Sequence, residues 1–169
     1  AYRKLAESSI TIDALEDAAR AYEELFKIDP RDIKVAISIS DVYLENNDYR
    51  QAIKWADKAT TLDSKNAEAL GQKGKVYYYG WDNFRSNPFT NDDRVVAKLS
   101  YNYFVKAVEK GFRGFEKINW MKENEKDILY GRAQWFMAID KVKRSRVIST
   151  TTADYEWVNE TLKAEEGWK

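Results

Sequence analysis

The sequence predicts an all-α protein, built as a solenoid of repeated helix–turn–helix units. Two observations indicate this fold class. First, the chain repeats at a spacing of 34 residues, which separates Ala18 from Ala52 and Asp29 from Asp63. Second, apolar residues within each half of a unit recur at the period of an α-helix. Helix pairs of this kind bury their apolar faces against neighbouring units, so the units are expected to form a row.

Composition excludes several classes of protein. The 169 residues carry 28 Lys and Arg against 28 Asp and Glu, and they include no Cys and no His. Nucleic acids and anionic membranes attract excess Lys and Arg, and no apolar stretch is long enough to span a bilayer. Without Cys and His, disulfides, the usual zinc sites and Ser-His-Asp catalysis are excluded. We therefore expect no enzyme, metal, cofactor, nucleic-acid partner or membrane insertion.

The compartment stays open at this point. The sequence begins at Ala1 without an initiator Met and lacks Cys. For a soluble protein this favours an exported or periplasmic location over a cytoplasmic one.

The first unit is clearest in its second helix. Asp13 and Glu16 have the spacing of a capping box, which predicts a helix start, and Pro30 ends the helix because proline cannot continue it. The apolar residues of this helix share one side: Leu15, Ala18, Ala19, Tyr22, Leu25 and Phe26.

The second unit contains two predicted helices. The first covers residues 33–44, with its apolar residues on one face: Val35, Ala36, Ile39, Val42 and Tyr43. A polar turn follows, and Asp48 with Gln51 again has capping-box spacing. The second helix carries Tyr49, Ala52, Ile53, Ala56 and Ala59 on one side. Ala18 and Ala52 are small, which lets antiparallel helices approach closely.

Residues 1–80 resemble the tetratricopeptide repeat family. The segment from Tyr49 to Ala59 and its exit turn are similar to the second helix and turn of such a repeat. The first helix of a third unit follows the pattern at Leu70, Gly74 and Tyr77. The sequence departs from the family at Lys73, where a large apolar residue is typical, and at Ser64, where a proline is typical. The resemblance implies a right-handed α-solenoid.

The 34-residue spacing is then lost. Residues 81–91 have the composition of a structured loop, which we interpret as an insertion into the third unit. Asp92 and Asp93 favour a helix start because acidic side chains stabilise a helix N-terminus, and Gly111 is the expected C-cap. Residues 1–111 are therefore expected to form three repeat units, the third interrupted.

Residues 112–169 match no repeat and are predicted to form a C-terminal helical capping region. We expect a loop over 112–120 that ends in a short helical turn around Trp120 and Met121, a helix over 128–142 and a final helix over 154–164. The residues expected to face inward on the helix over 128–142 are Ile128, Leu129, Ala133, Phe136, Ile139 and Val142. A repeat stack exposes an apolar end, and this region is expected to cover it.

In the tetratricopeptide family the first helices line a concave groove, so the resemblance implies a partner-binding site there. The positions carried over to this face are Arg3, Glu7, Lys34, Ile37, Asp41, Glu45, Glu68, Lys75, Tyr78 and Tyr79. Their mixed charge suits a polar peptide or a partner helix. The expected function is a protein–protein interaction scaffold, adaptor or assembly subunit.

Aromatic residues near the predicted loop offer another hypothesis. Trp81, Phe84 and Phe89 form a candidate platform for a carbohydrate or another small ligand, because rigid aromatic rings are favoured in binding sites. Alternatively, these rings pin the loop onto the helices. A further hypothesis is a purely structural subunit of a larger multiprotein complex.

A basic run follows the helix predicted over residues 128–142 and consists of Lys141, Lys143, Arg144 and Arg146. We interpret it as a complement to the dipole of a helix C-terminus rather than as a phosphate site.

Overall fold

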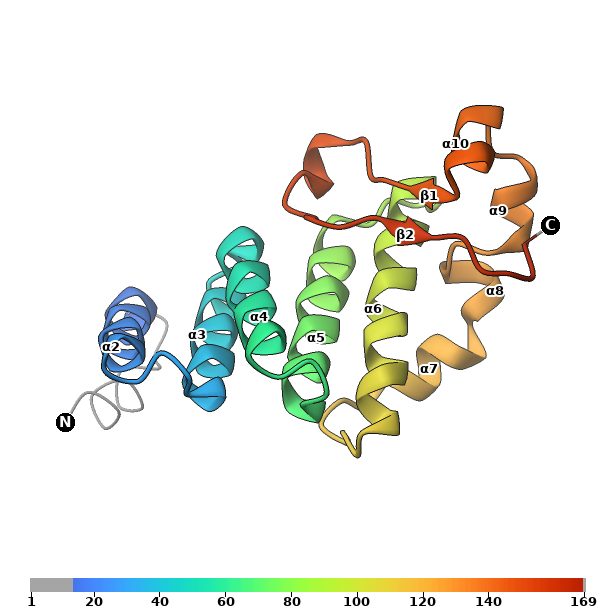
Figure 1. Cartoon of the computed structure of the whole chain (residues 1–169). Helices are drawn as coiled ribbons and strands as arrows, with labels where there is room; N and C mark the ends of the chain where they lie inside the picture. Colours follow the sequence, from blue (N-terminus) through green and yellow to red (C-terminus); the bar gives the residue numbers. More distant parts are fainter. Residues whose placement is uncertain (1–13, 169) are drawn as a thin grey trace.

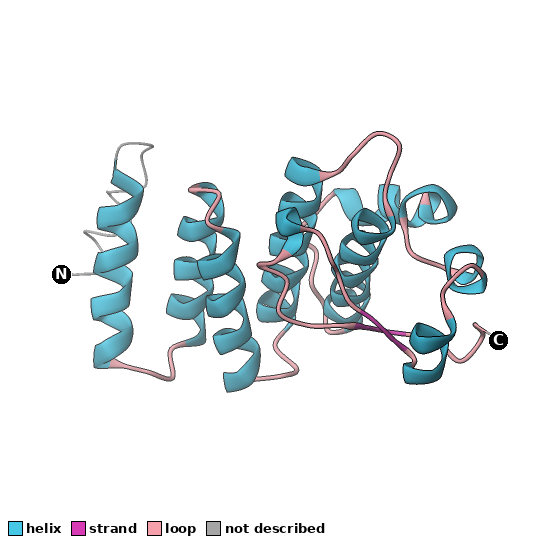
Figure 2. Ribbon diagram, turned by 90° about the horizontal axis from the view of Figure 1, so that it is seen from above, coloured by secondary structure: helices cyan, strands magenta, loops and turns pink. Residues whose placement is uncertain are grey.

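The computed structural model describes residues 14–168, and most of them are helical. The long helices lie side by side in a row (Figure 1): α2 (Leu15–Ile28), α3 (Ile33–Glu45), α4 (Tyr49–Leu62), α5 (Ala67–Phe84) and α6 (Asn91–Glu109). Each helix packs against the next one in sequence, as Figure 2 also shows. The all-α class is confirmed. Within residues 14–168, no helix has the length and apolar character that crossing a membrane requires.

The sequence repeat is also a repeat of structure. The bounds of α2 and α4 differ by 34 residues at both ends, and the starts of α3 and α5 differ by the same number. Asp32 accepts a hydrogen bond from the backbone N–H of Val35 at 3.1 Å, and Asn66 accepts one from Ala69 at 3.0 Å. Equivalent positions therefore cap equivalent helices, because their side chains satisfy N–H groups that lack partners inside the helix.

The predicted cap at Asp48 is confirmed, with its carboxylate 3.0 Å from the backbone nitrogen of Gln51. The small residues Ala18 and Ala52 are both fully buried, as their place between helices requires. The predicted cap at Asp13 lies outside the described residues, as does the start of the first unit.

The loop predicted over residues 81–91 is wrong for its first part. α5 continues through Trp81 to Phe84, and only residues 85–90 connect it to α6. Thr90 and Asp93 then form a capping box at the start of α6, and Gly111 has a left-handed φ of 100° directly after the C-cap. The helix predicted from Asp92 is therefore confirmed, although its C-cap is Lys110, one residue before the predicted Gly111.

The C-terminal region is less helical than the sequence predicts. It contains short helices and two short strands: α7 (Lys117–Glu123), α8 (Glu125–Ile128), α9 (Arg132–Phe136), α10 (Asp140–Ser145), β1 (Val147–Ile148), η2 (Ala153–Tyr155) and β2 (Leu162–Lys163). The single helix predicted over 128–142 is wrong, and so is the final helix predicted over 154–164. A tertiary contact interrupts the first of them, since the backbone N–H of Tyr130 donates to the carbonyl of Arg94 at 2.9 Å. The loop predicted over 112–120 ends earlier than expected, because α7 begins at Lys117 and includes Trp120 and Met121.

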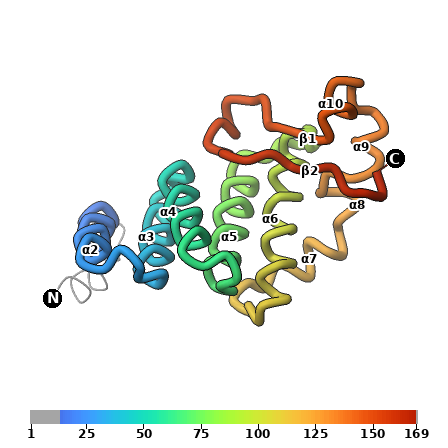
Figure 3. The backbone as a smooth tube through the Cα atoms, in the orientation of Figure 1, coloured from blue at the N-terminus to red at the C-terminus, as the bar shows by residue number. Residues whose placement is uncertain are grey.

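The two strands pair antiparallel, with Ile148 opposite Leu162. The segment between them, residues 149–161, is termed the tail and lies over α5 and α6 in Figure 3. Trp157 of the tail packs against Gly80 of α5, where an added Cβ would lie 2.3 Å from the indole ring. Only glycine permits this approach, because any side chain at position 80 would collide with the indole ring. The tail therefore packs directly against the backbone of α5.

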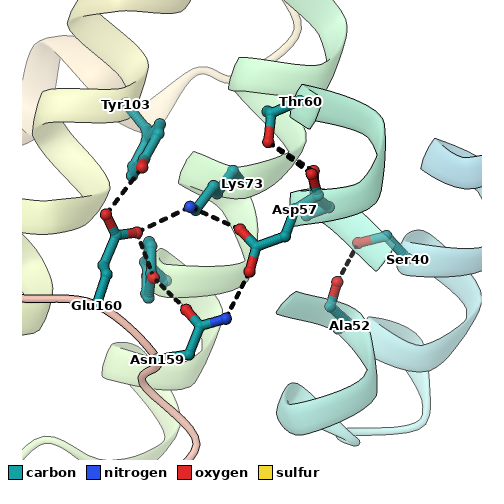
Figure 4. A network of polar contacts seen from close by, with 10 residues as sticks. Ser40, Ala52, Asp57, Thr60, Lys73, Tyr103, Asn159 and Glu160 are labelled. Atoms are coloured by element: carbon teal, nitrogen blue, oxygen red, sulfur yellow. Dashed lines mark hydrogen bonds and ion pairs between the residues drawn. The ribbon is translucent and has the colours of Figure 1, made fainter. Parts of the chain in front are cut away.

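An ion-pair network fixes the tail to three helices (Figure 4). The amine of Lys73 on α5 lies 2.6 Å from a carboxylate oxygen of Asp57 on α4 and 3.0 Å from one of Glu160 in the tail. The same Glu160 carboxylate accepts hydrogen bonds from Tyr77 at 2.6 Å and from Tyr103 of α6 at 2.9 Å. Lys73, the departure from the repeat pattern, is therefore a buried cation with two carboxylate partners.

The environment of Lys73 keeps it charged. Burial alone lowers the pKa of the amine, but Asp57, Tyr103 and Glu160 outweigh burial, so the net effect raises the pKa. Burial, followed by the charge and hydrogen bond of Glu160, raises the pKa of the Tyr77 hydroxyl as well.

A second attachment joins the tail to the start of α6. Asp92 accepts backbone hydrogen bonds from Thr151 at 2.6 Å and from Thr152 at 2.8 Å, and Asp93 accepts one from the hydroxyl of Tyr155 at 2.6 Å. The sequence predicted these carboxylates as a helix start, and the structure adds their role as acceptors for the tail.

Candidate functional site

A groove of about 570 Å³ lies between α3 and α5. Its lining also includes the turn after α3 and the connection that follows α6; the residues are Asp41, Leu44, Glu45, Asn47, Tyr49, Lys75, Tyr79, Asp82, Asn83, Gly114 and Phe115. Carboxylates, one amine and aromatic rings therefore meet on one surface.

Helical spacing explains why these side chains share a face. Lys75, Tyr79 and Asp82 stand at positions i, i+4 and i+7 of α5, which lie along one side of a helix. Lys73 and Tyr77 occupy the opposite side of α5, where the tail covers them. The groove and the tail therefore use opposite faces of the same helix.

The groove is built from equivalent repeat positions. Asp41 of α3 and Lys75 of α5 are separated by 34 residues, and so are Glu45 and Tyr79. Successive units thus contribute the same two positions to the same surface.

The charges in the groove are only partly compensated. Asp82 pairs with Arg85 at 2.9 Å, and Asp41 accepts a hydrogen bond from the side chain of Gln72 at 3.2 Å. Within residues 14–168, Glu45 and Lys75 have no ion-pair partner. Burial, and to a lesser extent the charge of Asp41, raises the pKa of Glu45. The free protein therefore holds an ionised Glu45 at a cost.

Aromatic side chains form one wall of the groove. Tyr79 is 45% exposed and meets Phe115 edge to face, with ring centroids 5.9 Å apart. Phe115 is itself anchored by an edge contact with Tyr78 at 4.9 Å. A partly exposed tyrosine on a rigid base is typical of protein-binding surfaces.

The structure places the ten predicted groove residues in different environments. Asp41, Glu45, Lys75 and Tyr79 line the groove, whereas Lys34 and Glu68 are exposed outside it. Ile37 is half-buried against the core. Arg3 and Glu7 lie outside the described residues.

Tyr78 requires a correction. It is only 6% exposed and packs against Trp81 and Phe115, so it supports the groove wall from behind instead of facing a ligand. Of the three consecutive tyrosines at positions 77–79, Tyr79 alone is exposed.

Trp81 of the candidate aromatic platform also requires a correction. Trp81 is fully buried, with ring contacts to Phe89 at 5.8 Å and Trp120 at 6.3 Å. Phe84 is half-buried between Tyr49 and Tyr155. These rings anchor the segment after α5 to the core, as the alternative interpretation expected, and Trp81 offers no face to a ligand.

Sequence reasoning missed several residues of the groove. Asp82 and Asn83 were assigned to a loop, although their spacing from Lys75 would have placed Asp82 on the groove face of a longer helix. Phe115 follows α6 and carries no repeat signal, so only the folded chain brings it to the site.

The fold and site define a mostly helical protein with a polar, aromatic-walled groove between two of its helices. Comparison with known proteins found no family model that matches the chain and no curated protein whose sequence matches it.

Replacing Glu45 with glutamine is expected to stabilise the free protein at neutral pH. A raised carboxyl pKa means that the ionised form is disfavoured by folding, so the wild-type protein loses stability as the pH rises through the pKa of Glu45. Because Glu45 is exposed and solvent screens its charge, the change should stay within about 0.5 kcal/mol, which corresponds to a rise of at most about 2 °C in the midpoint of thermal unfolding. The gain should vanish at acidic pH, where wild-type Glu45 is protonated.

Glu68→Gln is the matched control, because Glu68 is exposed on α5 and does not line the groove. Equal shifts for both variants, or a lower midpoint for Glu45→Gln at neutral pH, would contradict this electrostatic description of the groove.

Proposed function

We propose that this chain is a tetratricopeptide-type, right-handed α-solenoid that acts as a protein–protein interaction module. The proposed binding site is the groove between α3 and α5, and the ligand is a peptide segment or helix of a protein partner. No catalytic step and no cofactor belong to this proposal.

One observation carries the proposal. The groove is lined by the same two positions of successive units, Asp41 with Lys75 and Glu45 with Tyr79. Repeat proteins bind along extended surfaces made of equivalent positions, because each unit presents the same face to the same side. The 34-residue offset of the helix bounds and the burial of Ala18 and Ala52 support the same assignment.

The chemistry of the groove favours a polar partner. Three carboxylates and one amine line it, and Glu45 has no ion-pair partner among residues 14–168. A cationic side chain of the partner would compensate Glu45 and Asp41, while its apolar part packs against the exposed ring of Tyr79.

Site-specific photo-crosslinking in native extract tests this proposal. A benzoylphenylalanine placed at Tyr79, and separately at Glu45, is expected to join covalently to one and the same protein, identified by mass spectrometry. The control position is Lys54, which is exposed on α4 and does not line the groove. Adducts of equal yield from all three positions, or none from Tyr79 and Glu45, would refute the proposed site.

Once the partner is identified, Tyr79→Ala is expected to weaken its binding by about thirtyfold or more, the usual loss for a central aromatic residue of an interface. Isothermal titration calorimetry measures this loss, and Lys54→Ala serves as the control.

A further inference from the structure

Three large apolar side chains are exposed together between α9 and α10. Phe136, Met137 and Ile139 leave 74%, 80% and 67% of their surfaces exposed, and they are termed the apolar tip. The sequence predicted Phe136 and Ile139 as inward residues of one long helix. The structure corrects this: α9 ends at Phe136, and Trp135 is the residue of α9 that is buried in the core.

The apolar tip stands on a fixed base. The buried ring of Trp135 packs against Trp168 at 6.0 Å between centroids. The guanidinium of Arg146 lies 5.8 Å from the ring centroid of Trp135 and donates to the backbone carbonyl of Glu165 at 2.9 Å. Arg146, one of the predicted basic residues, therefore has a structural role that holds the tip in place.

Basic residues flank the apolar tip in the sequence. Residues 132–146 include one acidic residue and five basic ones, a local net charge of +4 in a chain whose total is zero: Arg132, Lys141, Lys143, Arg144 and Arg146. Lys143 binds the tip directly, since its amine donates to the carbonyl of Phe136 at 2.8 Å and lies 5.6 Å from the centroid of that ring. The zero net charge of the whole chain was the reason for excluding membrane surfaces. That total hides a local excess of positive charge in residues 132–146.

The position of the tip suits contact with a large flat surface. α9 and α10 lie at the end of the molecule opposite α2, as Figures 1 and 2 both show. The apolar tip lies outside the groove lining, so it is independent of the proposed peptide site.

We propose that the apolar tip and the flanking cations dock the protein onto an anionic phospholipid bilayer. Peripheral attachment of this kind combines two contributions: apolar side chains enter the boundary between headgroups and acyl chains, and Lys and Arg approach the lipid phosphates. Residues 132–146 contain both the exposed apolar side chains and the basic residues. A nucleic acid would use the cations but leave three exposed apolar side chains without a role, so the bilayer fits better.

Vesicle flotation with the full chain tests the proposal. Binding is expected to vesicles of phosphatidylcholine mixed with phosphatidylglycerol, with little or none to phosphatidylcholine alone, and it should fall as salt rises. The combined variant Phe136→Ser, Met137→Ser, Ile139→Ser should lower partitioning at least about tenfold. Lys141→Gln and Arg144→Gln should each lower it about fivefold, because each cation near an anionic surface contributes about that factor.

The matched control is Ile28→Ser, which removes an apolar side chain that is 69% exposed at the other end of the molecule. Because the substituted side chains are largely exposed, all variants should keep the wild-type midpoint of thermal unfolding. Unchanged flotation of the triple variant, or equal loss with Ile28→Ser, would overturn the proposal.

A second measurement reports insertion directly. The chain contains no Cys, so Met137→Cys accepts a single environment-sensitive fluorophore. Its emission is expected to shift to the blue on addition of anionic vesicles, whereas the same label on Ile28→Cys should not respond. Flotation without a shift at position 137 would mean that another surface contacts the lipid, and the proposal would fail.

Discussion

Lys73→Met is expected to destabilise the protein by about 3–5 kcal/mol, the usual cost of removing one member of a buried ion pair. Lys73 is buried and holds the carboxylates of Asp57 at 2.6 Å and Glu160 at 3.0 Å. Methionine fills a similar volume but leaves both carboxylates without their cation. Equilibrium urea unfolding of the two proteins measures the loss.

The pH dependence of this loss is also predicted. Because the folded-state pKa of Lys73 is raised, its contribution is complete below the ordinary lysine pKa and is lost only as the pH rises through the raised value. The difference between wild type and Lys73→Met should therefore stay constant across neutral pH and shrink only in strong alkali. Lys54→Met, at an exposed position of α4, is the control. Equal stability of Lys73→Met and wild type would show that the network contributes nothing.

Trp81→Ala should likewise cost about 3–5 kcal/mol, because it removes a large ring from a fully packed site. Trp81 touches Tyr78 and Phe89, and the guanidinium of Arg85 lies 4.9 Å from its ring centroid. Its indole N–H is buried without a hydrogen-bond acceptor among the described residues. Trp81→Phe should therefore cost much less than Trp81→Ala, since phenylalanine keeps part of the packing and removes the unsatisfied donor.

Tyr79→Ala provides the contrast within the same helix. Tyr79 is exposed on the groove, so its removal should leave the midpoint of thermal unfolding near that of wild type. Tyr78→Ala should behave like a core substitution, because that ring is buried. Loss of stability in Tyr79→Ala comparable to that in Trp81→Ala would mean that the groove wall is part of the core.

Local sequence signals were sufficient to predict α2 to α4 and the start of α5. Each of these helices combines an apolar face with a turn, and Asp32, Asp48 and Asn66 cap three of them within three residues of their own position. Information of this kind lies inside a short window of sequence, so periodicity and capping rules can find it.

The C-terminal region could not be predicted in the same way. The spacing of Phe136 and Ile139 is helical, yet both are exposed, because contacts from distant residues decide this part of the fold. Asp93 and Tyr155, for example, meet across 62 positions of sequence. The groove has both kinds of residue. Its positions on α3 and α5 follow from the repeat, whereas the contribution of Phe115 depends on how the distant segments fold together.

The tail changes how the molecule folds and opens. A row of helices with contacts only between neighbours can fray from either end. Here Asn159 contacts Asp57 across 102 positions, so the contacts of α4, α5 and α6 with the tail form only after a long chain segment closes. This raises contact order and couples these helices into one cooperative unit, whereas α2 and α3, which the tail does not reach, can open at lower free energy. Amide hydrogen exchange should therefore be fast in α2 and slow in α5.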